Sequence, residues 1–427
     1  MVEVQRLAAA ALGSVLAGRS LDTALATSWR RHPQLAARDR AAIQDLVYGT
    51  LRLLPRFEAL LEALLDRPLK DARLRPLLLA ALYQLGHTRA APHAVVNHAV
   101  RACEALSLTS AKALVNAVLR GYLRRRESLD ARAQRSEPAR YCHPQWWIDK
   151  LRDQYPAQYA AALEAANQRP PLTLRVNRRR GDLAGYLAQL ARHGIAAEAC
   201  GPSAVQLGKP LPAERIPGLA EGLVSVQDAG AQLAAPLLDL SDGMRVLDAC
   251  SAPGGKTGHL LEIAAVEVTA LDADATRLER VRANLARLGL AARVVSGDAC
   301  EPAQWWDEAP YHRILADVPC SASGVARRHP DVKWLRRPTD IAQFARQQSR
   351  MLIALWRLLA SGGKLLYVTC SVFQEENRDQ VARFLEHHRD ATRLSLPAVD
   401  NHAQLPPGQL LPDERHDGFF YVLLQKA

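Results

Sequence analysis

The sequence predicts a chain of three parts: an N-terminal bundle of α-helices, a small α+β module and a C-terminal doubly wound α/β domain. Its 427 residues exceed the roughly 150 that one domain usually holds. Apolar residues recur every three or four positions up to about residue 126, which is typical of helices. From about residue 243, short apolar strands alternate with helical patterns. We place the domains at residues 1–140, 141–235 and 236–427.

The composition excludes disordered and membrane-spanning classes. With 48% hydrophobic and 23% charged residues, the chain can bury ordinary cores. Its longest uncharged stretches, such as residues 7–18 and 76–88, are shorter than the roughly 18 to 20 residues that cross a bilayer. The seven cysteines include no C-x-x-C pair and no zinc-like spacing. We therefore expect a cytoplasmic protein with reduced thiols, no metal site and no membrane partner.

The N-terminal part reads as helices almost throughout. Ala42, Ile43, Leu46, Val47 and Leu51 illustrate its apolar spacing. Breaks are predicted at four positions and divide the part into six or seven helices. These positions are Gly18, Pro55, Pro68 and Gly86.

Positive charge is concentrated in this helical part. Residues 1–140 hold 22 Lys and Arg against 12 Asp and Glu, whereas residues 241–427 hold 23 of each. Seven arginines lie between Arg120 and Arg140, and three of them, at positions 124–126, are contiguous. This density can follow a polyanion backbone, so nucleic acid is the leading partner. A solvated helix surface is the alternative.

The middle part begins after a junction at residues 136–147, which contain two prolines and two adjacent tryptophans. Residues 172–177 alternate like a strand, a helix is expected over residues 183–193, and further short strands extend to about Val226. These elements predict a small α+β module.

Five strands are predicted in the C-terminal part, with helical patterns between them. They are residues 245–248, 267–272, 292–298, 313–317 and 364–369. Strands joined through helices form a parallel sheet covered on both faces. Residues 419–424 follow Asp417 and Gly418 and predict a closing antiparallel strand at one edge.

A glycine-containing turn follows the first of these strands. It consists of Cys250, Ser251, Ala252, Pro253, Gly254, Gly255 and Lys256. Glycines at a strand-to-helix turn let a ligand approach the backbone. A Walker A loop is excluded because that pattern needs Gly where Cys250 stands, and the strict G-x-G-x-x-G of a dinucleotide site is absent.

Acidic residues close strands one to four in turn: Asp248, Asp272, Asp298 and Asp317. Any one of them could equally cap a helix or turn. Four aspartates at the ends of successive strands favour a cationic adenosine ligand over a triphosphate. S-adenosylmethionine, which carries a sulfonium, an ammonium and ribose hydroxyls, suits this edge.

Cys320 and Cys370 follow the fourth and fifth strands, beside the same crevice. A thiolate beside a methyl donor is what methylation of a pyrimidine carbon needs, because addition to C6 of cytosine makes C5 nucleophilic. A carboxylic acid then stabilises the adduct and a base removes the C5 proton. Ser371 and Gln374 predict a helix start whose positive end favours the Cys370 thiolate, so Cys370 is the better nucleophile candidate.

These residues carry a resemblance to a known family. The strings DACSAPGGKT, LADVPCSASG and YVTCSVFQEEN resemble motifs of the RNA cytosine-5 methyltransferases, in particular the RsmB (Sun/Fmu) branch. Residues 1–126 resemble the NusB-type RNA-binding bundle, and residues 171–177 resemble the strand that opens the family's RRM-like middle module. Residues 327–334 also match the branch and offer basic and aromatic groups to an RNA base. Ser251 stands where relatives often carry Ala, and its small hydroxyl should still fit.

The resemblance implies roles for individual residues. Cys370 would be the nucleophile, Cys320 would assist product release and Asp317 would face the target base. Lys256 resembles the family's active-site lysine, and we assign it a pocket-shaping role. The implied S-adenosylmethionine contacts are Cys250, Ser251, Ala252, Pro253, Gly254, Gly255, Lys256, Asp272, Asp298 and Asp317.

We therefore expect a Rossmann-like, S-adenosylmethionine-dependent methyltransferase that acts on C5 of one cytosine in 16S ribosomal RNA, in the small ribosomal subunit or its precursor. We expect a monomer and no DNA partner. One alternative is the same chemistry on transfer RNA or another ribosomal site. Another is a NusB-like RNA-binding or antitermination factor whose methyltransferase domain is inactive.

Overall fold

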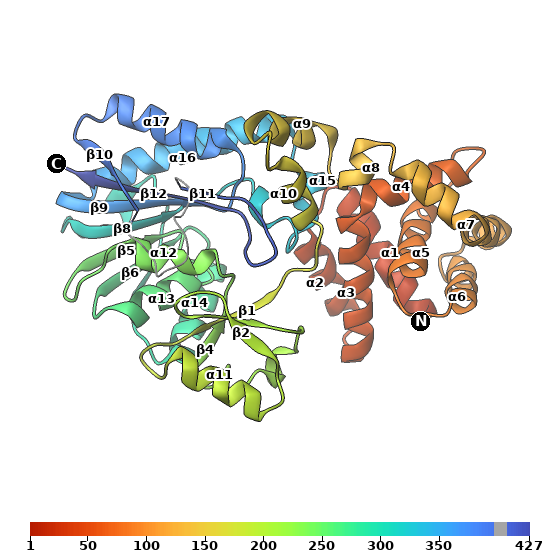
Figure 1. The fold of residues 1–427 in the computed structure, drawn as a ribbon, viewed down its shortest axis with the longest axis horizontal. Coiled ribbons are helices and arrows are strands. Elements are labelled where there is room, and N and C mark those ends of the chain that lie inside the picture. Colours follow the sequence, from red (N-terminus) through yellow and green to blue (C-terminus); the bar gives the residue numbers. More distant parts are fainter. Residues whose placement is uncertain (397–407) are drawn as a thin grey trace. The chain divides into compact units, whose positions relative to one another are not determined.

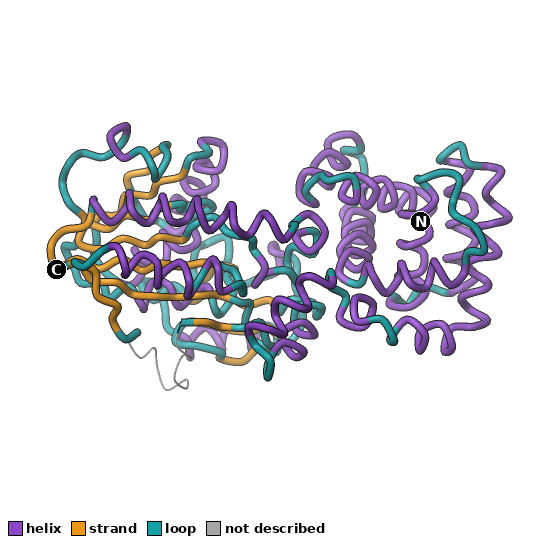
Figure 2. Tube along the Cα trace, turned by 90° about the horizontal axis from the view of Figure 1, so that it is seen from above, coloured by secondary structure: helices purple, strands orange, loops and turns teal. Residues whose placement is uncertain are grey.

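The computed structural model describes residues 1–396 and 408–427, which form two compact units (Figure 1). The first unit comprises Met1–Asn167 and Ala326–Arg337, and the second comprises Gln168–Val325 and Pro338–Ala427. All described strands belong to the second unit, whereas helices make up most of the first (Figure 2). The unit boundary after Asn167 lies downstream of the domain boundary expected at residue 140.

The first unit is a helical bundle, as the apolar spacing predicts. Its helices are α1 (Val2–Leu16), α2 (Leu21–Arg31), α3 (Ala37–Arg52), α4 (Leu54–Leu64), α5 (Leu74–His87), α6 (Pro92–Ala105), α7 (Lys112–Ala133), α8 (Glu137–Tyr141), α9 (Gln145–Gln154), α10 (Tyr159–Ala165) and α15 (Val332–Leu335). Gly18 and Pro68 separate helices, and Pro55 lies in the first turn of α4. The break predicted at Gly86 is displaced, because Gly86 lies in the last turn of α5.

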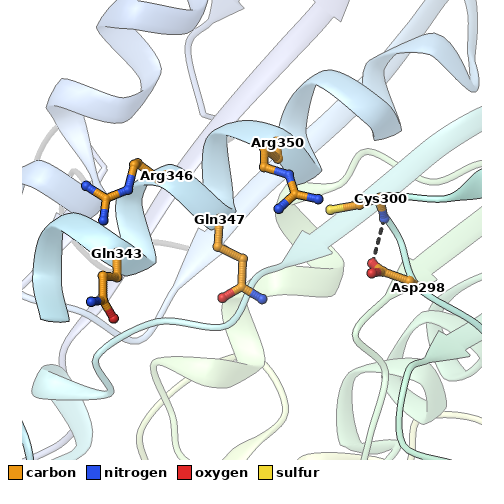
Figure 3. Close-up of a pocket in the computed structure, with 6 residues that line it drawn as sticks. All are labelled: Asp298, Cys300, Gln343, Arg346, Gln347 and Arg350. Carbon is orange, nitrogen blue, oxygen red and sulfur yellow. Dashed lines mark hydrogen bonds between the residues drawn. The ribbon is translucent and has the colours of Figure 1, made fainter.

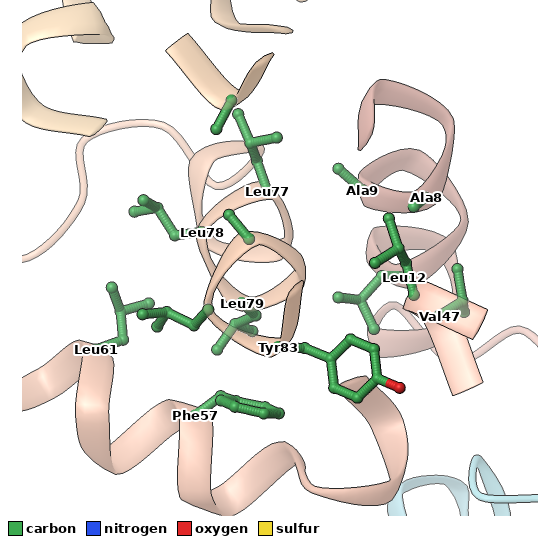
Figure 4. Packing of buried hydrophobic residues seen from close by; sticks show 14 of the residues in the cluster. Ala8, Ala9, Leu12, Val47, Phe57, Leu61, Leu77, Leu78, Leu79 and Tyr83 are labelled. Carbon is green, nitrogen blue, oxygen red and sulfur yellow. The ribbon is translucent and has the colours of Figure 1, made fainter. Parts of the chain in front are cut away.

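Helix α5 forms the centre of this bundle, with α1 and α4 packed on either side (Figure 4). Its side chains are buried almost all the way around, which explains why it lacks a polar face. The ring of Tyr83 in α5 packs edge to face against the ring of Phe57 in α4, with 6.0 Å between the ring centroids. Gly49 of α3 makes room for the Tyr83 ring, since a Cβ at position 49 would lie 2.0 Å from Tyr83 Cζ. Side-chain volume therefore fixes the packing of α3 against α5.

The segment Ala326–Arg337 is part of the helical unit, although it follows Cys320 of the second unit in sequence. Lys333 is fully buried, and its Nζ donates to Arg52 O, Cys142 O and Asn167 Oδ1 at 2.8, 2.8 and 2.9 Å. Trp334 Nε1 donates to Leu51 O at 2.8 Å. The prediction that residues 327–334 offer basic and aromatic groups to an RNA base is therefore wrong for these two side chains, because both are used inside the unit.

The α+β module in the second unit contains a four-stranded antiparallel sheet with the order β2-β3-β1-β4. Its elements are β1 (Leu172–Val176), α11 (Leu183–Arg192), β2 (Ala197–Ala199), β3 (Ala204–Leu207) and β4 (Val224–Val226). Leu190 and Tyr186 of α11 pack on the apolar face of this sheet. The strand and helix predicted from the alternation are thus confirmed.

The large sheet has the order β10-β12-β9-β8-β5-β6-β7, and β11 pairs with β12. Its strands are β5 (Arg245–Ala249), β6 (Glu267–Asp272), β7 (Arg293–Ser296), β8 (Tyr311–Asp317), β9 (Leu359–Thr369), β10 (Ala391–Leu394), β11 (Gln409–Leu410) and β12 (Phe419–Lys426). Strands β5 to β9 pair in parallel, as predicted. The expected antiparallel β12 is present, but its predicted edge position is wrong, because β10 pairs with its outer side.

Helices cover both faces of the large sheet (Figure 1). α16 (Pro338–Arg357) and α17 (Arg378–His387) cover one face, where Leu352, Leu355 and Phe384 join the core. α12 (Ala234–Leu237), α13 (Gly255–Ile263) and α14 (Ala275–Leu288) cover the other. This doubly wound arrangement brings the carboxyl ends of the parallel strands to one edge. No helix among the described residues combines the length and apolarity needed to cross a bilayer.

Candidate active site

The backbone of the turn between β5 and α13 lies close to helix α14. Gly254 has φ +94°, and a Cβ there would lie 3.1 Å from Val281 Cα in α14. Glycine is therefore required by both backbone and space. The turn is closed by a hydrogen bond from Gly254 N to Ser251 O at 2.7 Å and is tied to β6 by Ser251 N to Leu271 O at 2.8 Å.

Two of the predicted acids flank this turn. Asp248 is fully buried in β5, and its Oδ2 accepts from Thr257 Oγ1 at 2.6 Å. Burial raises the pKa of Asp248 to about 7, although the Thr257 hydrogen bond opposes the shift. Asp272, the last residue of β6, accepts from Ala252 N at 3.1 Å and from Asp274 N at 3.0 Å. Both carboxyl groups therefore help to shape the turn.

Lys256 of α13 and Asp317 of β8 form an ion pair. Lys256 Nζ donates to Asp317 Oδ2 at 2.6 Å and also lies 5.7 Å from the centre of the Phe419 ring in β12. Burial acts to lower the pKa of Lys256, but the neighbouring Asp317 carboxylate outweighs it, so the pKa is raised. Lys256 is therefore a cation at neutral pH and links the turn to the end of β8.

The thiols of the two candidate catalytic cysteines lie in contact. Cys320 Sγ lies 3.3 Å from Cys370 Sγ, because both residues follow the carboxyl ends of the adjacent strands β8 and β9. Cys320 is buried and Cys370 is partly exposed. The hydrogen bond to Cys370, together with burial, raises the pKa of the Cys320 thiol. The more accessible Cys370 is the thiol better placed to reach a substrate atom.

The helix start predicted at Ser371 is wrong. Residues Gln374–Glu376 form only a three-residue 3-10 turn, and α17 begins at Arg378. The Ser371 hydroxyl instead donates to Glu376 Oε2 at 2.5 Å. The same hydroxyl also accepts from Phe373 N at 3.1 Å, as a helix cap would, but no α-helix follows directly.

Asp298 takes a different environment from the other three acids. It lies two residues beyond the end of β7, and its Oδ1 accepts from Cys300 N at 2.8 Å. It lines a cavity of about 430 Å³ beside α16 (Figure 3). The other lining residues are Cys300, Gln343, Arg346, Gln347 and Arg350.

The residues of the turn fit the cofactor that the sequence predicts. Asp248 Oδ1 and Ser251 Oγ are buried and have no hydrogen-bond partner among the described residues. A carboxyl oxygen and a hydroxyl can accept from ammonium or ribose hydroxyl groups. Ser251, the departure from the family pattern, thus adds a polar atom to the turn.

Glu376 and its serine partners are functional candidates that our sequence reasoning missed. Glu376 is fully buried and contacts the residue after each cysteine, Ser321 and Ser371. The string YVTCSVFQEEN contains Glu376, but nothing in the string says which distant side chain it meets. Among the described residues, no cluster of three or more His, Cys, Asp or Glu could hold a metal ion.

Comparison with known families matches all three parts of the chain. Residues 235–425 match the family described as 16S rRNA methyltransferase RsmB/F. Residues 143–214 match a ferredoxin-like domain of RsmF/B-like methyltransferases, and residues 3–124 match the NusB family.

Individual relatives agree over the full length. The chain is 44% identical to ribosomal RNA small subunit methyltransferase B of Vibrio cholerae over 432 residues, which is 100% of this chain and 98% of that protein. It is 46% identical to the protein of the same name from Pseudomonas putida, over 99% and 98% of the two chains. The crystal structure of PH0851 has a TM-score of 0.80 at 21% identity and covers 100% of this chain and 99% of its own, which supports the fold.

Proposed function

The chain belongs to the RsmB/F family of 16S ribosomal RNA methyltransferases, and from this membership we propose that it methylates C5 of one cytosine in 16S ribosomal RNA with S-adenosylmethionine. The observation that carries the proposal is the 3.3 Å contact between the Cys320 and Cys370 thiols beside the Lys256–Asp317 ion pair. Two thiols at one strand edge suit a reaction in which one thiol bonds to the base and the other assists its release.

In this proposal Cys370 is the nucleophile. Its thiolate forms a bond to C6 of the cytosine, and the electron pair of the C5–C6 double bond moves toward N3 through C4, which makes C5 nucleophilic. Asp317 faces the base, and its carboxylate, paired with the Lys256 ammonium at 2.6 Å, orients the ring while negative charge develops at N3. After C5 has gained the methyl group, loss of the C5 proton to a base re-forms the double bond and expels the Cys370 thiolate. Cys320, in contact with Cys370, assists this release step.

S-adenosylmethionine, when bound, supplies the electrophilic methyl group. The residues that would hold it are those of the turn 250–256 together with Asp272, Asp298 and Asp317. The buried atoms Asp248 Oδ1 and Ser251 Oγ support this assignment, because each is an acceptor that no described protein group satisfies. Lys256 shapes the pocket by holding Asp317 at 2.6 Å.

We assign RNA recognition to the helical part. The seven arginines from Arg120 to Arg140 are all exposed, five of them on α7, which suits contact with RNA phosphates. We propose functional domains at residues 1–140, 141–235 and 236–427, acting in a cytoplasmic monomer on the small ribosomal subunit or its precursor, with no DNA partner.

Transfer of labelled methyl to unmodified 16S ribosomal RNA tests this function. We expect label at one cytosine C5, mapped by bisulfite sequencing, and its loss in Cys370→Ala. Transfer RNA serves as the second substrate. Label on transfer RNA alone would favour the same chemistry on another target. Absence of label with both RNAs, while RNA binding persists, would favour an RNA-binding factor.

A further inference from the structure

One buried carboxylate ties together the two loops that carry the cysteines. Glu376 Oε2 accepts from the Ser321 hydroxyl at 2.6 Å and from the Ser371 hydroxyl at 2.5 Å. Its Oε1 accepts from Ser321 N at 2.8 Å and from Gln348 Nε2 at 3.1 Å. Glu376 has no exposed surface. Four donors on one buried carboxylate make a strong local restraint.

Two of the donor residues stand next to the reacting groups. Ser321 follows Cys320, and Ser371 follows Cys370. The Ser323 hydroxyl lies 3.0 Å from those of both serines, so three hydroxyls and a carboxylate form one cluster. Gln348 of α16 extends it by donating to Pro319 O at 3.0 Å, on the other side of Cys320. The cluster therefore restrains the backbone on both sides of Cys320 and directly after Cys370.

We propose that Glu376 is a positioning residue for methyl transfer: its carboxylate holds the loops after β8 and β9 so that the two thiols stay in contact. This inference rests on the proposed function for its catalytic consequence. The nucleophile and the releasing group must reach the same base in sequence, and a displacement of about 1 Å can cost up to roughly 100-fold in rate.

The contact between the thiols can be measured without RNA or cofactor. Equilibration with reduced and oxidised glutathione gives the effective concentration of the two thiols for each other: Cys320 and Cys370 lose two electrons and two protons to form a disulfide, and oxidised glutathione becomes two reduced molecules. Mass spectrometry of the joined 320 and 370 peptides separates this pair from the other five cysteines. We expect Glu376→Gln to lower the effective concentration at least tenfold.

A matched control is Glu386→Gln, ten residues further on, where the side chain is exposed. It should leave the effective concentration unchanged. Glu376→Asp keeps the charge but shortens the side chain, so it should also lower the value, whereas a purely electrostatic role would be rescued by Asp. If Glu376→Gln fails to fold, Ser371→Ala removes one donor and should lower the value by a smaller factor.

Steady-state methyl transfer gives the second measurement. We expect Glu376→Gln to lower kcat at least tenfold and to change the KM for S-adenosylmethionine and for RNA less than twofold, because Glu376 touches neither. A folded Glu376→Gln protein with unchanged effective concentration would overturn the proposal, as would a wild-type pair that never closes. If the wild type transfers no methyl group, the proposed function fails, while the thiol equilibrium still decides the role of Glu376.

Discussion

Lys256 in the turn after β5 and Asp317 at the end of β8 are 61 positions apart in the chain, yet their charged atoms lie 2.6 Å apart. The pair joins the predicted cofactor turn to the strand that leads to Cys320. Asp317 is partly exposed, with 26% of its side-chain surface accessible, whereas 15% of Lys256 is accessible. The lysine therefore orients a carboxylate that remains partly accessible.

Replacing Lys256 tests whether its ammonium group acts through the Asp317 carboxylate. We expect Lys256→Met to lower kcat/KM for RNA by about 10- to 100-fold, since hydrogen bonds to charged groups contribute about 1.5 to 3 kcal/mol. Asp317→Asn and the double variant complete a double-mutant cycle. If the two residues act as a pair, the double variant loses less than the sum of the single losses; additive losses would contradict this coupling.

Cys320→Ala should trap a covalent protein–RNA adduct. Addition by Cys370 persists in this variant, whereas release is slowed because the thiol 3.3 Å from Cys370 Sγ is absent. The adduct should appear as a mass-shifted, denaturant-resistant species that requires both RNA and S-adenosylmethionine. Cys370→Ala, alone or combined with Cys320→Ala, should form no adduct. An adduct that survives in Cys370→Ala would reverse the assigned roles.

Asp248 should make the second unit less stable as pH rises. Burial raises its folded-state pKa to about 7, whereas an unfolded aspartate ionises near 3.9. Between these values the folded state binds more protons, so this stabilisation is present below about pH 4 and is lost as pH rises to about 7. Asp248→Asn removes the titration.

Hydrogen exchange of β5 measures this effect locally. Between pH 5 and pH 8, the opening free energy of the wild type should fall by about 3 kcal/mol more than that of Asp248→Asn. Asp153→Asn, at an exposed position, is the control. Equal pH dependence in the wild type and Asp248→Asn would show that Asp248 ionises normally in the folded protein.

The sequence predicts that the candidate active-site residues lie at one edge of the sheet because its main signals are local. Asp317, Cys320 and Cys370 stand at strand ends, and the carboxyl ends of parallel strands meet at one edge. Glu376 could not be placed, since its partner Ser321 lies 55 positions away and no periodicity encodes that contact. The sequence does not predict strand β10, because its four residues carry no buried face, and it therefore predicts β12 as the edge strand.

Lys333 shows the same limit in the helical unit, where its three acceptors come from segments far apart in the chain. Lys333→Met should leave three oxygens, two of them on buried residues, without this donor and cost at least about 2 kcal/mol. Hydrogen exchange in α3 and α9 should rise, whereas Lys70→Met, at an exposed lysine, should change neither helix. Unchanged protection in Lys333→Met would mean that water or another group replaces the ammonium.

The arginines of α7 test whether this unit binds RNA through phosphates. Arg124, Arg125 and Arg132 are exposed and make no side-chain hydrogen bond or ion pair within residues 1–396 and 408–427. Their replacement by Gln should therefore spare the fold. If each contacts one phosphate, the slope of log affinity against log salt concentration should fall by about 2 in magnitude, and affinity at about 0.1 M salt should fall at least tenfold. Gln at the exposed Arg357, Arg389 and Arg393 of the second unit removes the same charge, so an equal loss there would indicate attraction by net charge rather than a binding surface on α7.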